Sequence, residues 1–141
     1  MVVLDTGNNL AYTGPMYFGQ PSQGNATTAH FILDTTSGFV SVRNTYYDYS
    51  KSFSNHTADQ YKNKSLMTYG NATFTGSMIM DTVCFNPQKA WSCAMSYDYF
   101  VVNGTDNTTN STAYSQFDGV LGLAPNSTSG EGVSFIMALY N

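Results

Sequence analysis

Ionised side chains are scarce in this chain of 141 residues. Asp, Glu, Lys and Arg together make up 10% of it, against about a quarter in an ordinary globular protein. The net charge is −4, and the five Lys and Arg residues are scattered along the sequence. Nucleic acids and anionic membranes bind clustered basic residues, so the composition argues against both as partners. No apolar run approaches the roughly 18 residues that a membrane-spanning helix needs.

Potential metal ligands are equally few. His30 and His56 are the only histidines, and Cys84 and Cys93 lie far from both in the sequence. These groups form no metal-ligand motif, so we expect neither a metal nor another cofactor. The two cysteines are nine residues apart, and so close a pair in a secreted protein favours one loop-closing disulfide. Two free thiols are the alternative.

Long stretches with helical periodicity are also absent. Short apolar or alternating runs, rich in Thr, Tyr, Val and Phe, follow one another between clusters of Gly, Asn and Ser. This pattern predicts an all-β fold, a barrel or sandwich of short antiparallel strands with at most one or two short helices. The length and the 42% of hydrophobic residues suit a single domain with a core.

Three segments give more local predictions. Residues 65–80 (SLMTYGNATFTGSMIM) indicate a β-hairpin around a Gly-Asn turn. Residues 103–116 are polar and of low complexity, which is typical of an exposed loop. Residues 131–141 (EGVSFIMALYN) suggest a short helix, with Ser129 as a candidate N-cap.

Sequons for N-glycosylation are abundant where charge is scarce. Eight of the thirteen asparagines begin an N-x-S/T sequon, and chance alone would give roughly three. Glycans would supply the polar coat that ionised side chains do not, so we expect a heavily N-glycosylated, extracellular protein. The alternative is a chain rich in Ser, Thr and Asn that forms sequons by accident. The sequons begin at Asn25, Asn55, Asn63, Asn71, Asn103, Asn107, Asn110 and Asn126.

The first fifteen residues lack the features of a secretion signal. They contain neither a basic segment nor a continuous apolar one. Because the sequons and cysteines indicate secretion, we expect the chain to be a mature or partial form.

Four segments, in this order, resemble the N-terminal lobe of the pepsin-like aspartic proteases. Residues 12–23 (YTGPMYFGQPSQ) resemble the family's opening Y-x-G-x-I-x-I-G-T-P-x-Q, and residues 31–37 (FILDTTS) resemble V-x-F-D-T-G-S. Residues 69–83 (YGNATFTGSMIMDTV) resemble its flap hairpin, and residues 117–125 (FDGVLGLAP) resemble F-D-G-I-L-G-L-A. The resemblance implies one domain, 1–141, with the fold of a single pepsin-like lobe, half of the usual two-lobed enzyme.

The resemblance also implies which residues form the site. Asp34 matches the catalytic aspartate, Thr35 and Ser37 match the hydroxyl residues beside it, and Tyr69 matches the tyrosine of the flap. The family's reaction needs two carboxyl groups that share one proton. One lobe supplies one of them, so a second copy or another chain would have to supply the other. Residues 4–7 (LDTG) also spell the family's motif, but they precede its opening segment, and we interpret them as coincidence.

Three positions depart from the family's pattern. Thr36 replaces a glycine beneath the substrate and adds a β-branched side chain there. Ser41 replaces a tryptophan that hydrogen-bonds to the flap tyrosine. Asn71 places a sequon on the flap, where a glycan would obstruct substrate entry and flap closure. These departures favour a non-catalytic extracellular module with a structural, assembly or recognition role.

Two other functions remain open at this point. The chain is alternatively one lobe of a secreted aspartic endopeptidase whose second lobe lies on another chain or in further sequence. It is otherwise a carbohydrate-binding or adhesive module, in which Tyr46, Tyr47 and Tyr49 stack on sugars. A lone lobe leaves one face uncovered, so we also expect a second protein chain or copies of this chain to pack there.

Overall fold

The computed structural model describes residues 12–19, 27–36, 38, 40–47, 52, 56–57, 64–68, 72–105, 118–125 and 134–140. These residues form eight strands, one 3-10 turn and one α-helix. The all-β fold with few helices is therefore confirmed. The elements are β1 (Thr13–Phe18), β2 (Thr27–Asp34), β3 (Val40–Arg43), β4 (His56–Thr57), β5 (Lys64–Thr68), β6 (Ala72–Cys84), η5 (Ala90–Ser92), β7 (Cys93–Thr105), β8 (Gly119–Gly122) and α1 (Phe135–Tyr140).

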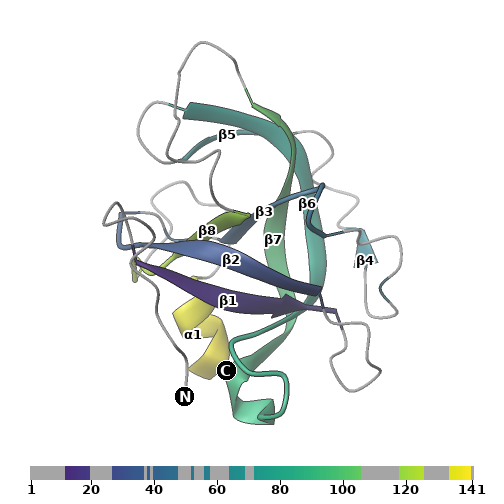
Figure 1. Cartoon of the computed structure of the whole chain (residues 1–141), viewed down its shortest axis with the longest axis vertical. Coiled ribbons are helices and arrows are strands. Elements are labelled where there is room, and N and C mark those ends of the chain that lie inside the picture. Colours follow the sequence, from purple (N-terminus) through teal and green to yellow (C-terminus); the bar gives the residue numbers. More distant parts are fainter. Residues whose placement is uncertain are drawn as a thin grey trace.

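Six of the strands close into a ring. The hydrogen-bonded order is β1-β2-β8-β3-β7-β6, and β6 returns to β1, where Phe18 lies opposite Val83. In Figure 1, β6 and β7 form a long twisted arch that β1 and β2 cross. A closed sheet has no unpaired edge, which is the physical advantage of a barrel. β4 and β5 pair with β6 outside this ring.

The sheet is mixed, and its strands differ in length. The expectation that all strands are antiparallel is wrong, because β2 pairs with β8 and β3 pairs with β7 in parallel. β8 lies between β2 and β3 and is antiparallel to β3. The strands are also not uniformly short, since β6 and β7 have 13 residues each. Parallel partners need long connections, so no short sequence pattern could have indicated these pairings.

Aromatic side chains fill the centre of the barrel. Phe18 is fully buried, and its ring centroid lies 5.5 Å from that of Phe31, 5.1 Å from Tyr47 and 5.0 Å from Tyr99. Such tilted and stacked pairs stabilise a core beyond the burial of their area. Tyr47 is only 3% exposed, so the expectation that it stacks on sugars is wrong. Tyr46 is exposed, and Tyr49 lies outside the described residues.

The local predictions had different outcomes. β5 and β6 form the expected hairpin, with Thr68 opposite Ala72, and the turn between them lies outside the described residues. The expected loop over 103–116 begins too early, because β7 continues to Thr105, where it pairs with Phe74 of β6. The rest of that segment is outside the described residues.

The C-terminal helix is shorter than expected. α1 begins at Phe135, and Ser134 caps it by accepting the Met137 N–H on its hydroxyl oxygen at 3.3 Å and the Ala138 N–H on its carbonyl at 2.9 Å. Ser134 is therefore the N-cap in place of Ser129, which lies outside the described residues. Within the described part of the chain, no helix has the length and apolar character needed to cross a membrane.

Candidate functional site

Asp34 stands at the end of a buried strand. The apolar residues before it place β2 in the sheet, with Phe31 and Ile32 buried, and the register sets Asp34 opposite Gly122 of β8. The Asp34 carbonyl accepts the Leu123 N–H at 2.7 Å, which fixes the backbone just after the two strands end. The side chain of Asp34 is 7% exposed. A carboxylate at the ends of two adjacent parallel strands is thus held by a rigid scaffold.

The two oxygens of the Asp34 carboxylate have different surroundings. Oδ1 accepts two hydrogen bonds from Thr36, one from its backbone N–H at 2.9 Å and one from its hydroxyl at 2.7 Å. Oδ2 is buried and has no hydrogen-bond partner within the described part of the chain. Thr36 therefore makes one contact through its backbone and a second through a hydroxyl group that a glycine would lack.

The structure describes part of the predicted site. Asp34, Thr35 and Thr36 lie together, and both threonines are exposed. Ser37, Tyr69 and Asn71 lie outside the described residues, so their predicted roles stay predictions. Ser41, named above as a departure from the family's pattern, is fully buried in β3, and its hydroxyl has no hydrogen-bond partner among the described residues.

Asp118 holds together the strands around the site, a role that the sequence analysis did not identify. Its carboxylate accepts the His30 N–H at 2.6 Å, its own N–H donates to the His30 carbonyl at 3.0 Å, and its carbonyl accepts the Arg43 N–H at 2.9 Å. Gly119 follows, and a Cβ there would lie 2.1 Å from the Ser41 carbonyl oxygen. Asp118 and Gly119 thus tie β2, β3 and β8 together, and the Asp-Gly pair was the available signal in the sequence.

One of the eight sequons falls on described residues. Asn103 is exposed and lies at a bulge of β7, because Val102 pairs with Gly76 while Gly104 pairs with Thr75. The unpaired position leaves the Asn103 side chain accessible to modification. Asn25, Asn55, Asn63, Asn71, Asn107, Asn110 and Asn126 lie outside the described residues.

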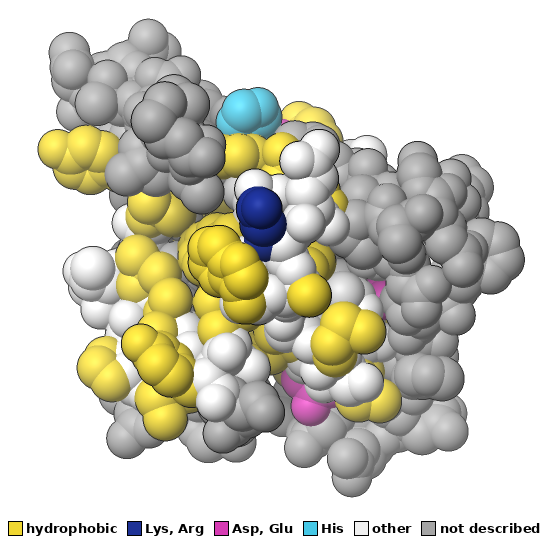
Figure 2. Space-filling model, turned by 90° about the horizontal axis from the view of Figure 1, so that it is seen from below, with side chains coloured by type: hydrophobic (Ala, Val, Ile, Leu, Met, Phe, Trp, Pro, Cys, Tyr) yellow, Lys and Arg dark blue, Asp and Glu magenta, His cyan; other side chains and the backbone are white. Residues whose placement is uncertain are grey.

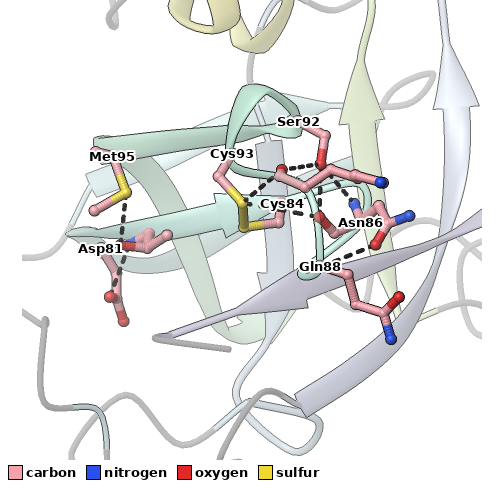
Figure 3. The surroundings of a disulfide bond; sticks show 9 residues. Asp81, Cys84, Asn86, Gln88, Ser92, Cys93 and Met95 are labelled. Atoms are coloured by element: carbon pink, nitrogen blue, oxygen red, sulfur yellow. Dashed lines mark hydrogen bonds between the residues drawn. A yellow bond between two sulfur atoms is a disulfide. The ribbon is translucent and has the colours of Figure 1, made fainter. Parts of the chain in front are cut away.

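The predicted disulfide between Cys84 and Cys93 is confirmed. It joins the end of β6 to the start of β7 and closes the loop between them (Figure 3). Figure 3 also shows Ser92 pointing across this loop toward Asn86. The Ser92 hydroxyl lies 2.6 Å from the Asn86 carbonyl and 2.8 Å from the Lys89 carbonyl, and it accepts the Asn86 N–H at 3.1 Å. The disulfide and these hydrogen bonds give the loop a defined shape.

Two hollows flank this loop. The one we call the loop groove has a volume of about 480 Å³ and lies between the loop and the barrel. Its lining is mostly apolar and consists of Gly14, Pro15, Met16, Leu33, Phe85, Asn86, Lys89, Trp91, Ser92, Leu121 and Leu123. The other, of about 500 Å³, lies between the loop, β7 and α1, and Asp98 is among its lining residues. Trp91 borders both hollows and is 78% exposed.

The comparisons with known proteins provide no family for the chain. No protein-family model matches it, and a search of curated proteins finds no match. Among the described residues, no three of His, Cys, Asp and Glu lie close enough together to hold a metal ion. The chemistry open to Asp34 and to the loop groove therefore follows from their own contacts.

Proposed function

We propose that this chain is a pepsin-like lobe that does not hydrolyse peptides by itself and serves as an extracellular, N-glycosylated recognition or assembly module. The observation that carries the proposal is the state of the Asp34 carboxylate. Thr36 donates both of its hydrogen bonds to Oδ1, and no second carboxyl group of the described chain is bonded to Oδ2.

Peptide hydrolysis of this type depends on a pair of carboxyl groups. One removes a proton from the attacking water while the other gives a proton to the scissile carbonyl, and the pair is close enough to share a single proton. If Asp34 takes the proton from water, a lone lobe has no second carboxyl group to give a proton to the scissile carbonyl. A lone lobe is therefore expected to bind without cleaving.

The arrangement of the sheet supports the proposed likeness to a pepsin-like lobe. Three of the segments that carry the resemblance are direct neighbours, since β1 pairs with β2 and β2 pairs with β8. The fourth contains nearly all of β6, which pairs with β5 and also returns to β1. β1 and β8, which are far apart in the sequence, thus flank the strand that ends in Asp34.

A half-site of an aspartic endopeptidase is the second candidate, and one observation favours it. A buried carboxylate oxygen without a hydrogen-bond partner is uncommon and needs an explanation, and a catalytic role is one such explanation. Oδ2 of Asp34 is such an atom. The second carboxyl group would then come from another copy or another chain, and the site would be complete only in that assembly.

Peptidase assays on the glycosylated chain separate these two candidates. We expect the protein secreted from eukaryotic cells to cleave a fluorogenic peptide no faster than the Asp34→Asn variant at any pH between about 3 and 6, the range in which a carboxyl dyad is active. The Thr36→Gly variant should be equally inactive, because it restores space beside Asp34 without supplying a second carboxyl group. Cleavage that Asp34→Asn abolishes, and that rises with the square of protein concentration, would instead establish a half-site completed by a second copy.

The extracellular, glycosylated state is tested separately. Enzymatic removal of N-glycans should lower the mass of the secreted chain by several glycan units, and glycopeptide analysis should find Asn103 and Asn71 occupied. The Asn103→Gln variant should lose one unit. A secreted chain with no change in mass would show that the sequons are unused.

A further inference from the structure

We infer that the loop groove binds a small amphipathic anion, a molecule with an aliphatic or aromatic body and one carboxylate or similar group. Asp34 does not line the groove, although Leu33 and Leu123 of the lining adjoin its backbone, and the inference does not depend on the proposed function. It is carried by the apolar floor of the groove, by its single cation and by the fixed shape of the 84–93 loop.

The floor of the loop groove is apolar and comes from three strands. Met16 of β1, Leu33 of β2 and Leu121 of β8 lie beneath it; Met16 and Leu121 are buried, and the apolar surface that remains open comes from residues such as Leu33, Phe85 and Leu123. Leu33, Phe85 and Leu123 are only partly buried although they pack against the core. The volume of about 480 Å³ lies within the roughly 300–1,000 Å³ of small-molecule sites. Covering this surface would remove apolar area from water, which favours a ligand with an apolar body.

The charge in the groove selects the head group. Among the described residues that line the groove, Lys89 is the one that carries a charge, and none is acidic. Asn86 adds an amide beside it. Figure 2 shows the face on which the loop and α1 lie, where one basic side chain stands among hydrophobic ones. The whole protein has a net charge of −4, but this local arrangement attracts an anionic ligand. A cationic ligand would find no acidic group among the described lining residues.

The wall of the groove is held in place before any ligand arrives. The disulfide closes the loop, and Ser92 hydrogen-bonds across it to Asn86. The Lys89 N–H donates to the Asn86 carbonyl at 3.1 Å, and the Gln88 N–H donates to the Asn86 side-chain oxygen at 2.9 Å. A preformed wall lowers the entropy cost of binding.

Trp91 marks the rim of the groove. An indole is usually well buried, yet this one is largely exposed on the loop that carries Lys89. A bound apolar chain would cover part of it and shift its fluorescence to shorter wavelength. Because Trp91 is the only tryptophan of the chain and borders both hollows, its emission reports on the loop between them, and variants of Lys89 and Leu123, which line the loop groove alone of the two, show which hollow is occupied.

Titration with three ten-carbon amphiphiles that differ in the charge of the head group tests the inference. Decanoate, decylammonium and a neutral decyl glycol ether, each kept below its micelle concentration, are added while Trp91 emission and calorimetric heat are recorded. We expect saturable binding of decanoate and at least tenfold weaker binding of decylammonium. Lys89→Met should weaken decanoate binding roughly three- to fivefold, the range for a partly exposed ion pair, and leave the neutral ether unchanged. Lys89→Arg should restore decanoate binding.

Control variants distinguish the groove from general surface adsorption. Leu123→Trp places bulk in the groove and should abolish calorimetric binding, with thermal unfolding used to verify that this variant folds. Tyr46→Ala removes an exposed aromatic residue that does not line the groove and should bind decanoate like the parent chain. Equal affinity for all three amphiphiles, or absence of saturation up to about 1 mM decanoate, would overturn the inference. So would a Trp91 emission that depends on protein concentration alone, since the occupant would then be a second copy of the chain.

Discussion

At the scale of single residues, the side chain of Asp81 makes a buried polar contact with Tyr47 inside the barrel core. Asp81 is fully buried on β6, where it accepts the Tyr47 hydroxyl and, at 2.7 Å, the Thr82 N–H. Burial, followed by the hydrogen bond to Asp81, raises the pKa of Tyr47 above its ordinary value of 10.0. The pair is therefore held together as a neutral phenol that donates to a carboxylate.

We expect Tyr47→Phe to destabilise the fold by about 1–3 kcal/mol, because it removes a donor from a buried charged group while keeping the ring. The free energy of unfolding in urea measures this loss. Tyr46→Phe is the matched control, since Tyr46 is exposed on the neighbouring position, and it should change stability by less than about 0.5 kcal/mol. Equal stabilities of the two variants would mean that the Tyr47–Asp81 contact contributes nothing in solution.

Asp98 on β7 gives the second prediction at this scale, a dependence of stability on pH. Burial raises the pKa of Asp98 above its ordinary value of 3.8. Between the unfolded pKa and the raised folded pKa, the folded state binds more protons than the unfolded state, so this group lowers stability as pH rises through that window. Denaturant unfolding of the parent chain and of Asp98→Asn should therefore give a difference in stability that grows in favour of the variant from pH 3.8 upward. A difference that is independent of pH would contradict the raised pKa.

Local spacing indicated one of the contacts near the candidate site. The disulfide spans nine residues and was predicted from the cysteine spacing, whereas Asp34 and Thr36 were named from the resemblance and their hydrogen bonds were not predicted. The Tyr47–Asp81 bond spans 34 residues and the bond from His30 to Asp118 spans 88. Nothing in the turn that contains Tyr47 distinguishes a buried tyrosine from an exposed one, which is why the sequence left stacking on sugars open for it.

At the scale of elements, the close approach of β6 and β7 depends on Gly76. A Cβ at this position would lie 1.9 Å from the Val101 carbonyl oxygen and 3.1 Å from a ring carbon of Phe100. The register between the two strands also shifts between Thr75 and Gly76. The absence of a side chain thus allows the bulge at which the ladder between these long strands changes register.

We expect Gly76→Ala to cost at least about 2 kcal/mol, because backbone of β7 has to move to admit the methyl group. Urea unfolding measures the loss. Ser77→Ala, one residue further along β6, is the matched control and should stay within about 0.5 kcal/mol of the parent. A Gly76→Ala variant as stable as this control would show that the two strands separate freely at the bulge.

At the scale of the whole molecule, the class of fold was predictable and its closure was not. Alternating apolar runs between turn residues indicate strands and a barrel or sandwich, and the β5–β6 hairpin follows from a short turn. The contacts that close the ring join Phe18 to Val83 and, in parallel, Phe31 to Gly119. Such pairings are determined by how a complete core packs, so they are invisible in any window of sequence as short as a strand.

Hydrogen exchange provides the prediction that tests the closed ring. Every strand of the ring is hydrogen-bonded on both sides, whereas β5 (Lys64–Thr68) pairs with β6 alone. Backbone amides of Phe31, Ile32 and Leu121 should therefore exchange only through global unfolding, while those of β5 exchange through local opening. In mass-spectrometric exchange experiments we expect β5 to exchange at least about 100-fold faster than β2 and β8, which corresponds to an opening free energy lower by about 2.8 kcal/mol.

β1 is the decisive segment, because its Phe18 end meets β6 and the Gly19 N–H donates to the Thr82 carbonyl at 3.0 Å. Protection of β1 equal to that of β2 requires a closed barrel in solution, and exchange of β1 as fast as that of β5 would show that the ring is open between β1 and β6.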